Sequence, residues 1–162
     1  MTADARFLPF PNNSFDKIVS QDADAWMHTD KKSLMLEINR VLKVNGTFMW
    51  QSYATSEHST KDKTKKLLRG VGYDFNDLPA YTGIKKMFLD SGFSIVKFYS
   101  LHDIYSKDNI SMLRKALKIK KLTGDKSIDN YINLLQWEKK LFKDHLWTGV
   151  LITATKIKKP TN

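Results

Sequence analysis

Residues 4–20 read DARFLPFPNNSFDKIVS, a turn-rich segment that leads into a short apolar run. The residues Pro11-Asn12-Asn13 are typical of a turn, and residues 15–20 have the pattern of a buried strand. Apolar residues then recur at helical spacing from Leu34 to Leu42, and residues 47–53 form a second strand pattern after Asn45-Gly46, which should stop the helix. Strand, helix and strand in succession predict an α/β fold.

The rest of the chain continues this alternation. Residues 54–80 are polar and irregular, which predicts a lid-like loop. A helix is expected from Thr82 to Gly92, where a glycine suits the C-terminal cap. The remaining patterns are a strand, two helices divided by Thr123-Gly124-Asp125, and a last strand, at 93–100, 108–122, 127–145 and 147–155. The order favours a mainly parallel sheet with flanking helices, with 103–145 as a helical insertion.

Composition narrows the class of protein. The chain has 162 residues, no cysteine, no apolar stretch long enough to cross a bilayer and no signal-peptide pattern, so we expect a cytoplasmic protein with no membrane partner. Its four histidines are scattered, so we expect no metal site. The net charge of +10 comes from residues 61–162. That bias fits either a solvated helix face or an anionic partner, but no nucleic-acid-binding motif accompanies it.

Four segments, in order, resemble motifs of the class I S-adenosylmethionine-dependent methyltransferases. They are residues 4–16 (D-A-x-x-L-P-F-x-D-N-S-F-D), 37–46 (E-x-x-R-V-L-K-P-G-G), 91–93 (A-G-F) and 147–156 (the closing strand ending A-x-K). Val44 and Asn45 replace the usual Pro and first Gly, and asparagine tolerates a left-handed turn. The resemblance implies a partial Rossmann-like fold, with strands 4–7 of a seven-stranded sheet.

The same resemblance predicts what this sequence lacks. None of its seven glycines forms the glycine-rich turn that grips the cofactor in this family. The chain alone should therefore bind S-adenosylmethionine, or its product S-adenosylhomocysteine, weakly or not at all. Its first strand should present a bare edge, which seeks a complementary N-terminal half or a second copy of the chain. The alternative is a non-catalytic truncated homologue or partner subunit that uses this edge to bind another chain.

One branch of the family fits better than others. Residues 20–31, SQDADAWMHTDK, resemble the S-[QR]-D-A-x-x-H-x-x-D-K segment of phosphoethanolamine and sarcosine/dimethylglycine N-methyltransferases. The motif's acid aligns with either Asp22 or Asp24, and the spacing to His28 favours Asp24. A small-molecule amine is thus the expected methyl acceptor. Because a protonated amine has no lone pair, the resemblance implies His28 as the base and Asp24 as the carboxylate that orients it.

The resemblance also assigns binding residues. For the cofactor it implies Asp4 and Ala5 at the adenine, and Ser20, Gln21 and Asp22 at the methionine part, where the first strand ends. For the substrate it implies four residues that hold a phosphate group, namely Tyr53, Arg69, Tyr73 and Lys140. The gap between Arg69 and Tyr73 is longer than in the family.

Overall fold

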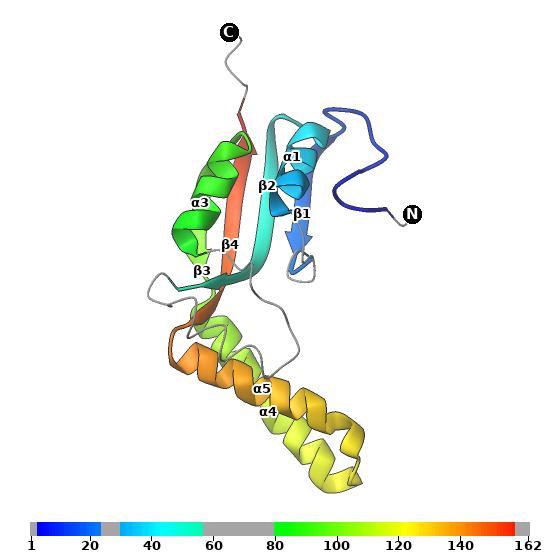
Figure 1. Cartoon of the computed structure of the whole chain (residues 1–162), viewed down its shortest axis with the longest axis vertical. Helices are drawn as coiled ribbons and strands as arrows, with labels where there is room; N and C mark the ends of the chain where they lie inside the picture. Colours follow the sequence, from blue (N-terminus) through cyan, green and yellow to red (C-terminus); the bar gives the residue numbers. More distant parts are fainter. Residues whose placement is uncertain (1–2, 24–29, 57–79, 158–162) are drawn as a thin grey trace.

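The computed structural model describes residues 3–23, 30–56 and 80–157, which form one sheet with helices on one face and a helical hairpin at one end (Figure 1). The sheet has the order β1-β2-β4-β3. Its strands are β1 (Phe15–Gln21), β2 (Leu42–Thr55), β3 (Phe93–Ser100) and β4 (Trp147–Lys156). The helices are α1 (Lys31–Val41), α3 (Tyr81–Asp90), α4 (His102–Thr123), the short 3-10 helix η2 (Lys126–Ile128) and α5 (Asp129–Lys143). These elements confirm the predicted α/β class.

The strand directions refine the expectation of a mainly parallel sheet. β1 pairs with β2 in parallel, whereas β4 lies antiparallel between β2 and β3. Three strands therefore run one way and β4 runs back. The reason lies in the helical hairpin, which consists of α4, η2 and α5. Its two antiparallel helices return the chain to the end of the sheet at which β3 finishes. A strand that starts at that end must run opposite to β3.

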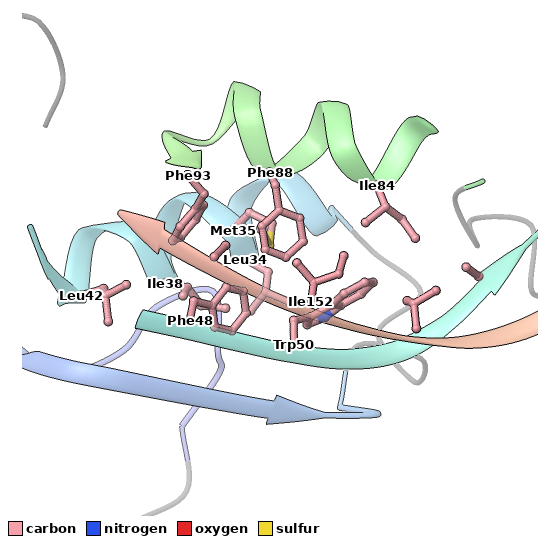
Figure 2. Close-up of a cluster of buried hydrophobic side chains, with 13 residues drawn as sticks. Leu34, Met35, Ile38, Leu42, Phe48, Trp50, Ile84, Phe88, Phe93 and Ile152 are labelled. Carbon is pink, nitrogen blue, oxygen red and sulfur yellow. The ribbon is translucent and has the colours of Figure 1, made fainter. Parts of the chain in front are cut away.

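The main core lies between the sheet and the two helices that cover one of its faces, α1 and α3. Along β2 the alternate residues Phe48, Trp50, Ser52 and Ala54 point into this core, as a strand period of two requires. Figure 2 shows Ile84 and Phe88 of α3 and Met35 of α1 directed at the same strands.

Element boundaries differ from the sequence patterns at two places. α1 ends at Val41 and β2 begins at Leu42, so the helix stops before Asn45-Gly46. Asn45 does adopt the left-handed conformation (φ 64°), and a Cβ on Gly46 would lie 2.8 Å from the Lys43 carbonyl oxygen. These two residues therefore shape an irregular start of β2 rather than the end of α1.

At the hairpin, α4 begins at His102, six positions before the apolar pattern, and α5 ends at Lys143. Gly124 caps α4 in the left-handed conformation (φ 66°), as expected for the divide between the two helices. Within the described residues, no helix combines the length and apolarity that a bilayer crossing requires.

Candidate functional site

A cavity of about 380 Å³ lies where the helical hairpin meets the ends of the strands. Ligands in open α/β sheets bind beyond the carboxyl ends of the parallel strands, and β1 and β2 both end here. The residues that line it come from the end of β1, from β2, from β4 and from the helical hairpin. They are Gln21, Asp22, Gln51, Tyr53, Leu101, Ile104, Tyr105, Asp108, Asn109, Met112, Glu138, Phe142 and Leu151.

A hydrogen-bond network around Tyr105 joins the hairpin to the two strands. The Tyr105 hydroxyl accepts from Gln51 Nε2 (2.8 Å) and lies 3.3 and 3.4 Å from the two carboxylate oxygens of Asp22, to which it donates. Burial, with a smaller contribution from the negative charge of Asp22, raises the pKa of Tyr105 to about 12. The phenol therefore keeps its proton at neutral pH and remains a donor.

Asp22 itself is held in an uncommon backbone conformation just after β1. Its φ is 51°, in the left-handed region, and its backbone N–H donates to the Gln51 carbonyl oxygen at 2.8 Å. Aspartate tolerates this region better than most residues, and such conformations concentrate at functional sites. The turn aims the Asp22 carboxylate into the cavity.

Aromatic rings form a second wall of the cavity. The Tyr53 ring meets Tyr105 edge to face with centroids 5.0 Å apart, and it lies 4.5 Å from the Trp147 ring. Phe142 stacks against Trp147 with ring centroids 5.9 Å apart. Burial, assisted by the nearby Glu138 and Asp22 charges, raises the pKa of Tyr53, so this phenol is also neutral.

On the hairpin side, the buried Asn109 of α4 and the half-buried Glu138 of α5 form a polar pair. Asn109 Nδ2 donates to Glu138 Oε2 at 2.8 Å and to the Leu135 carbonyl oxygen at 3.1 Å. Both partners are acceptors, so the amide nitrogen must face them. The Oδ1 atom of Asn109 is buried without a hydrogen-bond partner, and burial raises the pKa of Glu138 against the effect of the Asn109 hydrogen bond.

The structure brings some of the residues expected at the site together and separates another. Gln21, Asp22 and Tyr53 line the cavity, and Ser20 lies half-buried in β1, opposite Trp50 of β2. Lys140 is exposed on α5 with its Nζ 5.7 Å from the Trp137 ring centroid, and it does not line the cavity. Four expected site residues fall outside the described residues, namely Asp24, His28, Arg69 and Tyr73.

The segment expected to contact the adenine lies beside the start of α1. Asp4 accepts several hydrogen bonds from Arg6, including one of 2.6 Å from Nη2, and these lower the pKa of Asp4 to about 2. Asp4 raises the pKa of Arg6 in turn, with a small contribution from Asp30, which caps the N-terminus of α1. Ala5 packs against the main core. Asp4 therefore presents an ionised, partly exposed carboxylate.

Glu37 and Arg40, for which no role was predicted, hold this segment against α1. Glu37 Oε1 accepts from the Leu8 backbone N–H at 2.7 Å, and Arg40 donates to the carbonyl oxygens of Leu8 (3.0 Å) and Phe10 (2.8 Å). Arg40 also pairs with Glu37 at 2.7 Å. The E-x-x-R spacing is the sequence pattern that indicates this pairing of Glu37 with Arg40, since residues three apart share a helix face.

Replacing Arg40 with alanine should loosen residues 4–12 while the sheet stays folded. Three hydrogen bonds to that segment disappear, so chymotrypsin should cleave after the exposed Phe7 several-fold faster than in the unaltered chain. Arg114→Ala, on the exposed side of α4, is the matched control and should leave the cleavage rate unchanged. Equal rates in all three proteins would show that Arg40 does not hold the segment.

The same contacts should respond to pH. The Arg40 hydrogen bonds lower the pKa of Glu37 below its ordinary value. Its stabilising effect is therefore complete above the pKa of an unfolded glutamate and is lost as the pH falls through the lower folded value. Cleavage after Phe7 should accelerate on acidification only below the ordinary glutamate range, measured with pepsin because chymotrypsin loses its histidine base in acid.

Comparisons with known proteins place this geometry in context. Residues 1–50 match a family model described as a methyltransferase domain. The chain is 38% identical over 77 residues to a ubiquinone/menaquinone biosynthesis C-methyltransferase of Teredinibacter turnerae, covering 48% of this chain and 28% of that protein. It is 28% identical over 116 residues to phosphoethanolamine N-methyltransferase 1 of Arabidopsis thaliana, covering 72% of this chain and 21% of that protein. The chain thus spans about a quarter of the length of these relatives.

Solved structures share the fold. A putative sarcosine dimethylglycine methyltransferase from Galdieria sulphuraria superposes with a TM-score of 0.85 at 18% identity, over 96% of this chain and 58% of that one. Phosphoethanolamine N-methyltransferase 2 of Haemonchus contortus, solved with phosphomonomethylethanolamine and S-adenosylhomocysteine, gives 0.79 at 19% identity, over 96% and 36%. The resemblance drawn from the four sequence segments is confirmed.

Proposed function

We propose that this chain, a member of the class I S-adenosylmethionine-dependent methyltransferases, forms the substrate side of an enzyme that N-methylates a small amine. The observation that carries the proposal is the cavity at the carboxyl ends of β1 and β2, where Gln21, Asp22 and Tyr53 meet. Open α/β sheets bind their ligands at this end, beyond the carboxyl ends of the strands. The fold alone does not fix the methyl acceptor, so the amine is inferred from the relatives.

The described residues fit the cofactor in part. Asp4 has an ionised carboxylate that suits an exocyclic amine, and the backbone at Gln21 and Asp22 lies at the strand end expected to face the methionine part. When bound, S-adenosylmethionine supplies an electrophilic methyl group. The contribution of the chain is to orient the amine in line with that group and to exclude water.

Proton removal completes the reaction. The amine must lose its ammonium proton before its nitrogen lone pair can attack, and the methyl group then moves from sulfur to nitrogen. His28 is the proposed base and Asp24 the carboxylate that orients it. Tyr105 and Tyr53 stay protonated at neutral pH, so they act as hydrogen-bond donors or ring surfaces rather than as bases.

Calorimetry with S-adenosylmethionine and S-adenosylhomocysteine tests whether cofactor binding requires a glycine-rich half in addition to this chain. This sequence has no glycine-rich turn, so we expect no binding in the low micromolar range by the chain alone. Mixed with the glycine-rich half of a relative as a separate polypeptide, the chain should form methylated amine, and His28→Ala should abolish that product. Tight cofactor binding by the isolated monomer, or unchanged turnover of His28→Ala, would contradict the respective part of the proposal.

A second candidate function, a non-catalytic partner that binds another chain through its sheet edge, is supported by β1. In the described sheet β1 pairs only with β2, and its Val19 side chain is 70% exposed. An unpaired edge strand with an exposed apolar residue favours pairing with another polypeptide. Gel filtration and the assay for methylated product together distinguish the two candidate functions. A stable complex of this chain with another polypeptide that yields no methylated product supports the second.

A further inference from the structure

Positive charge is concentrated at the far end of the helical hairpin. Residues 114–126, here called the hairpin tip, lie at the end of the hairpin that projects away from the sheet (Figure 1). They include six lysine or arginine residues and one acid, Asp125, whose carboxylate accepts hydrogen bonds from Ser127. Lys120 pairs with Asp129 of α5. The other five cations are exposed and form no ion pair within the described residues.

The helix dipole explains only part of this charge. The negative end of a helix favours cations in its last turn, which accounts for Lys120 and Lys121 of α4. Arg114, Lys115 and Lys118 lie before the last turn, where this effect has faded. Charge alone fits a solvated helix face or an anionic partner, and the apolar side chains between the lysines decide between the two.

Large apolar side chains are exposed among these lysines. Leu122 is 75% exposed, Ile119 49% and Leu117 44%. Residues four apart are neighbours on a helix surface, so Leu122 lies beside Lys118 and Ile119 beside Lys115. A solvated helix face gains nothing from these apolar residues. An exposed apolar cluster that is rimmed by cations marks an interaction surface.

The surface of an anionic lipid bilayer suits both kinds of side chain. Its headgroup phosphates and carboxylates attract the lysines, whose long apolar stems let the ammonium groups stay at headgroup level. The acyl chains just below can bury the leucine and isoleucine side chains. A nucleic acid would pair with the cations but leave the apolar side chains in water. The combination at the hairpin tip therefore favours a membrane.

We infer that the hairpin tip binds the surface of an anionic membrane, with Lys115 and Lys118 at the headgroups and Ile119 and Leu122 at the boundary with the acyl chains. Binding of this kind needs no helix that crosses the bilayer. It departs from the expectation of no membrane partner, which rested on the lack of a bilayer-spanning stretch in the sequence. It is independent of the proposed function, because none of these four residues lines the cavity.

Cosedimentation of the full chain with lipid vesicles tests the membrane contact. Phosphatidylcholine vesicles with about 30% phosphatidylserine should bind the chain at least roughly tenfold more tightly than phosphatidylcholine alone, and added salt should weaken this binding. The double variant Lys115→Gln/Lys118→Gln should weaken it about tenfold. The matched control, Lys17→Gln/Lys97→Gln, removes the same charge from exposed positions of β1 and β3 and should weaken it less than about twofold.

Leu122→Ser tests the apolar part of the contact, because it removes no charge. It should weaken vesicle binding several-fold, whereas Leu89→Ser, at a 59% exposed position of α3, should not. Circular dichroism checks that each variant folds. Equal binding to both kinds of vesicle, no binding to either, or equal losses in the two double lysine variants would overturn the inference. Tighter binding to a short DNA duplex, unaffected by Leu122→Ser, would also overturn it and identify a nucleic acid as the partner.

Discussion

The Phe88→Ala variant is expected to lose about 3–5 kcal/mol of the free energy of unfolding, the largest effect of any single truncation considered for this chain. Phe88 is fully buried on α3, and its ring centroid lies 5.8 Å from each of the rings of Phe48, Trp50 and Phe93. It therefore fills the space between the helix and two strands (Figure 2). Alanine leaves a cavity there that three large rings cannot close by small movements.

Urea denaturation followed by tryptophan fluorescence measures this loss. Natural domains have only about 5–15 kcal/mol of stability in total, so the variant should be close to unfolded at moderate urea. Leu89→Ala is the matched control, one position along the same helix but 59% exposed, and should change stability by less than about 0.5 kcal/mol. If the two variants lost the same amount, α3 would not pack on the sheet as described.

The Gly149→Ala variant is expected to damage the cavity rather than the main core. Its added Cβ would lie 2.6, 2.7 and 2.9 Å from three carbons of the Tyr105 ring, closer than any real contact. Gly149 is therefore required by the close approach of Tyr105. Tyr105 lines the cavity, and a ring displaced by this Cβ would strain or break its hydrogen bonds to Gln51 and Asp22. We expect a cost of about 1–3 kcal/mol and loss of ligand binding.

A double-mutant cycle isolates this clash. In a Tyr105→Ala background the obstructing ring is gone, so Gly149→Ala should there cost much less, and the coupling between the two sites should account for most of the single-variant effect. Thermal unfolding of the four proteins provides the values. Additive effects of the two substitutions would show that Gly149 is needed for a reason other than its contact with Tyr105.

The sequence predicted the elements of the sheet region well because their signals are local. Phe48, Trp50 and Ala54 alternate with more exposed residues on β2, and Gly92 and Gly124 adopt the left-handed conformation at the ends of helices as expected. The start of α4 was placed too late because residues 102–107 show no helical apolar period. They are helical because Tyr105 packs against β2 and β4, which no local pattern indicates.

The site was predictable only where a family motif covers it. Gln21, Asp22 and Tyr53 were expected near the ligand and line the cavity, while Tyr105 and Glu138 were missed because their partners lie far away in the sequence. The Tyr105–Asp22 contact spans 83 positions. One local sign existed for Asn109, which shares a helix face with the buried Leu113 and Ala116. A lone polar residue on an apolar face is expected to have a specific partner.

The antiparallel course of β4 has a consequence for which part of this protein can change in length. The chain leaves the sheet through α4 and rejoins it through α5 at the same end of the strands. Equal numbers of helical turns added to both helices near the exposed Gly124 would therefore lengthen them without shifting any strand. The sheet thus acts as a constant platform, and the reach of the projecting pair of helices can change independently of it.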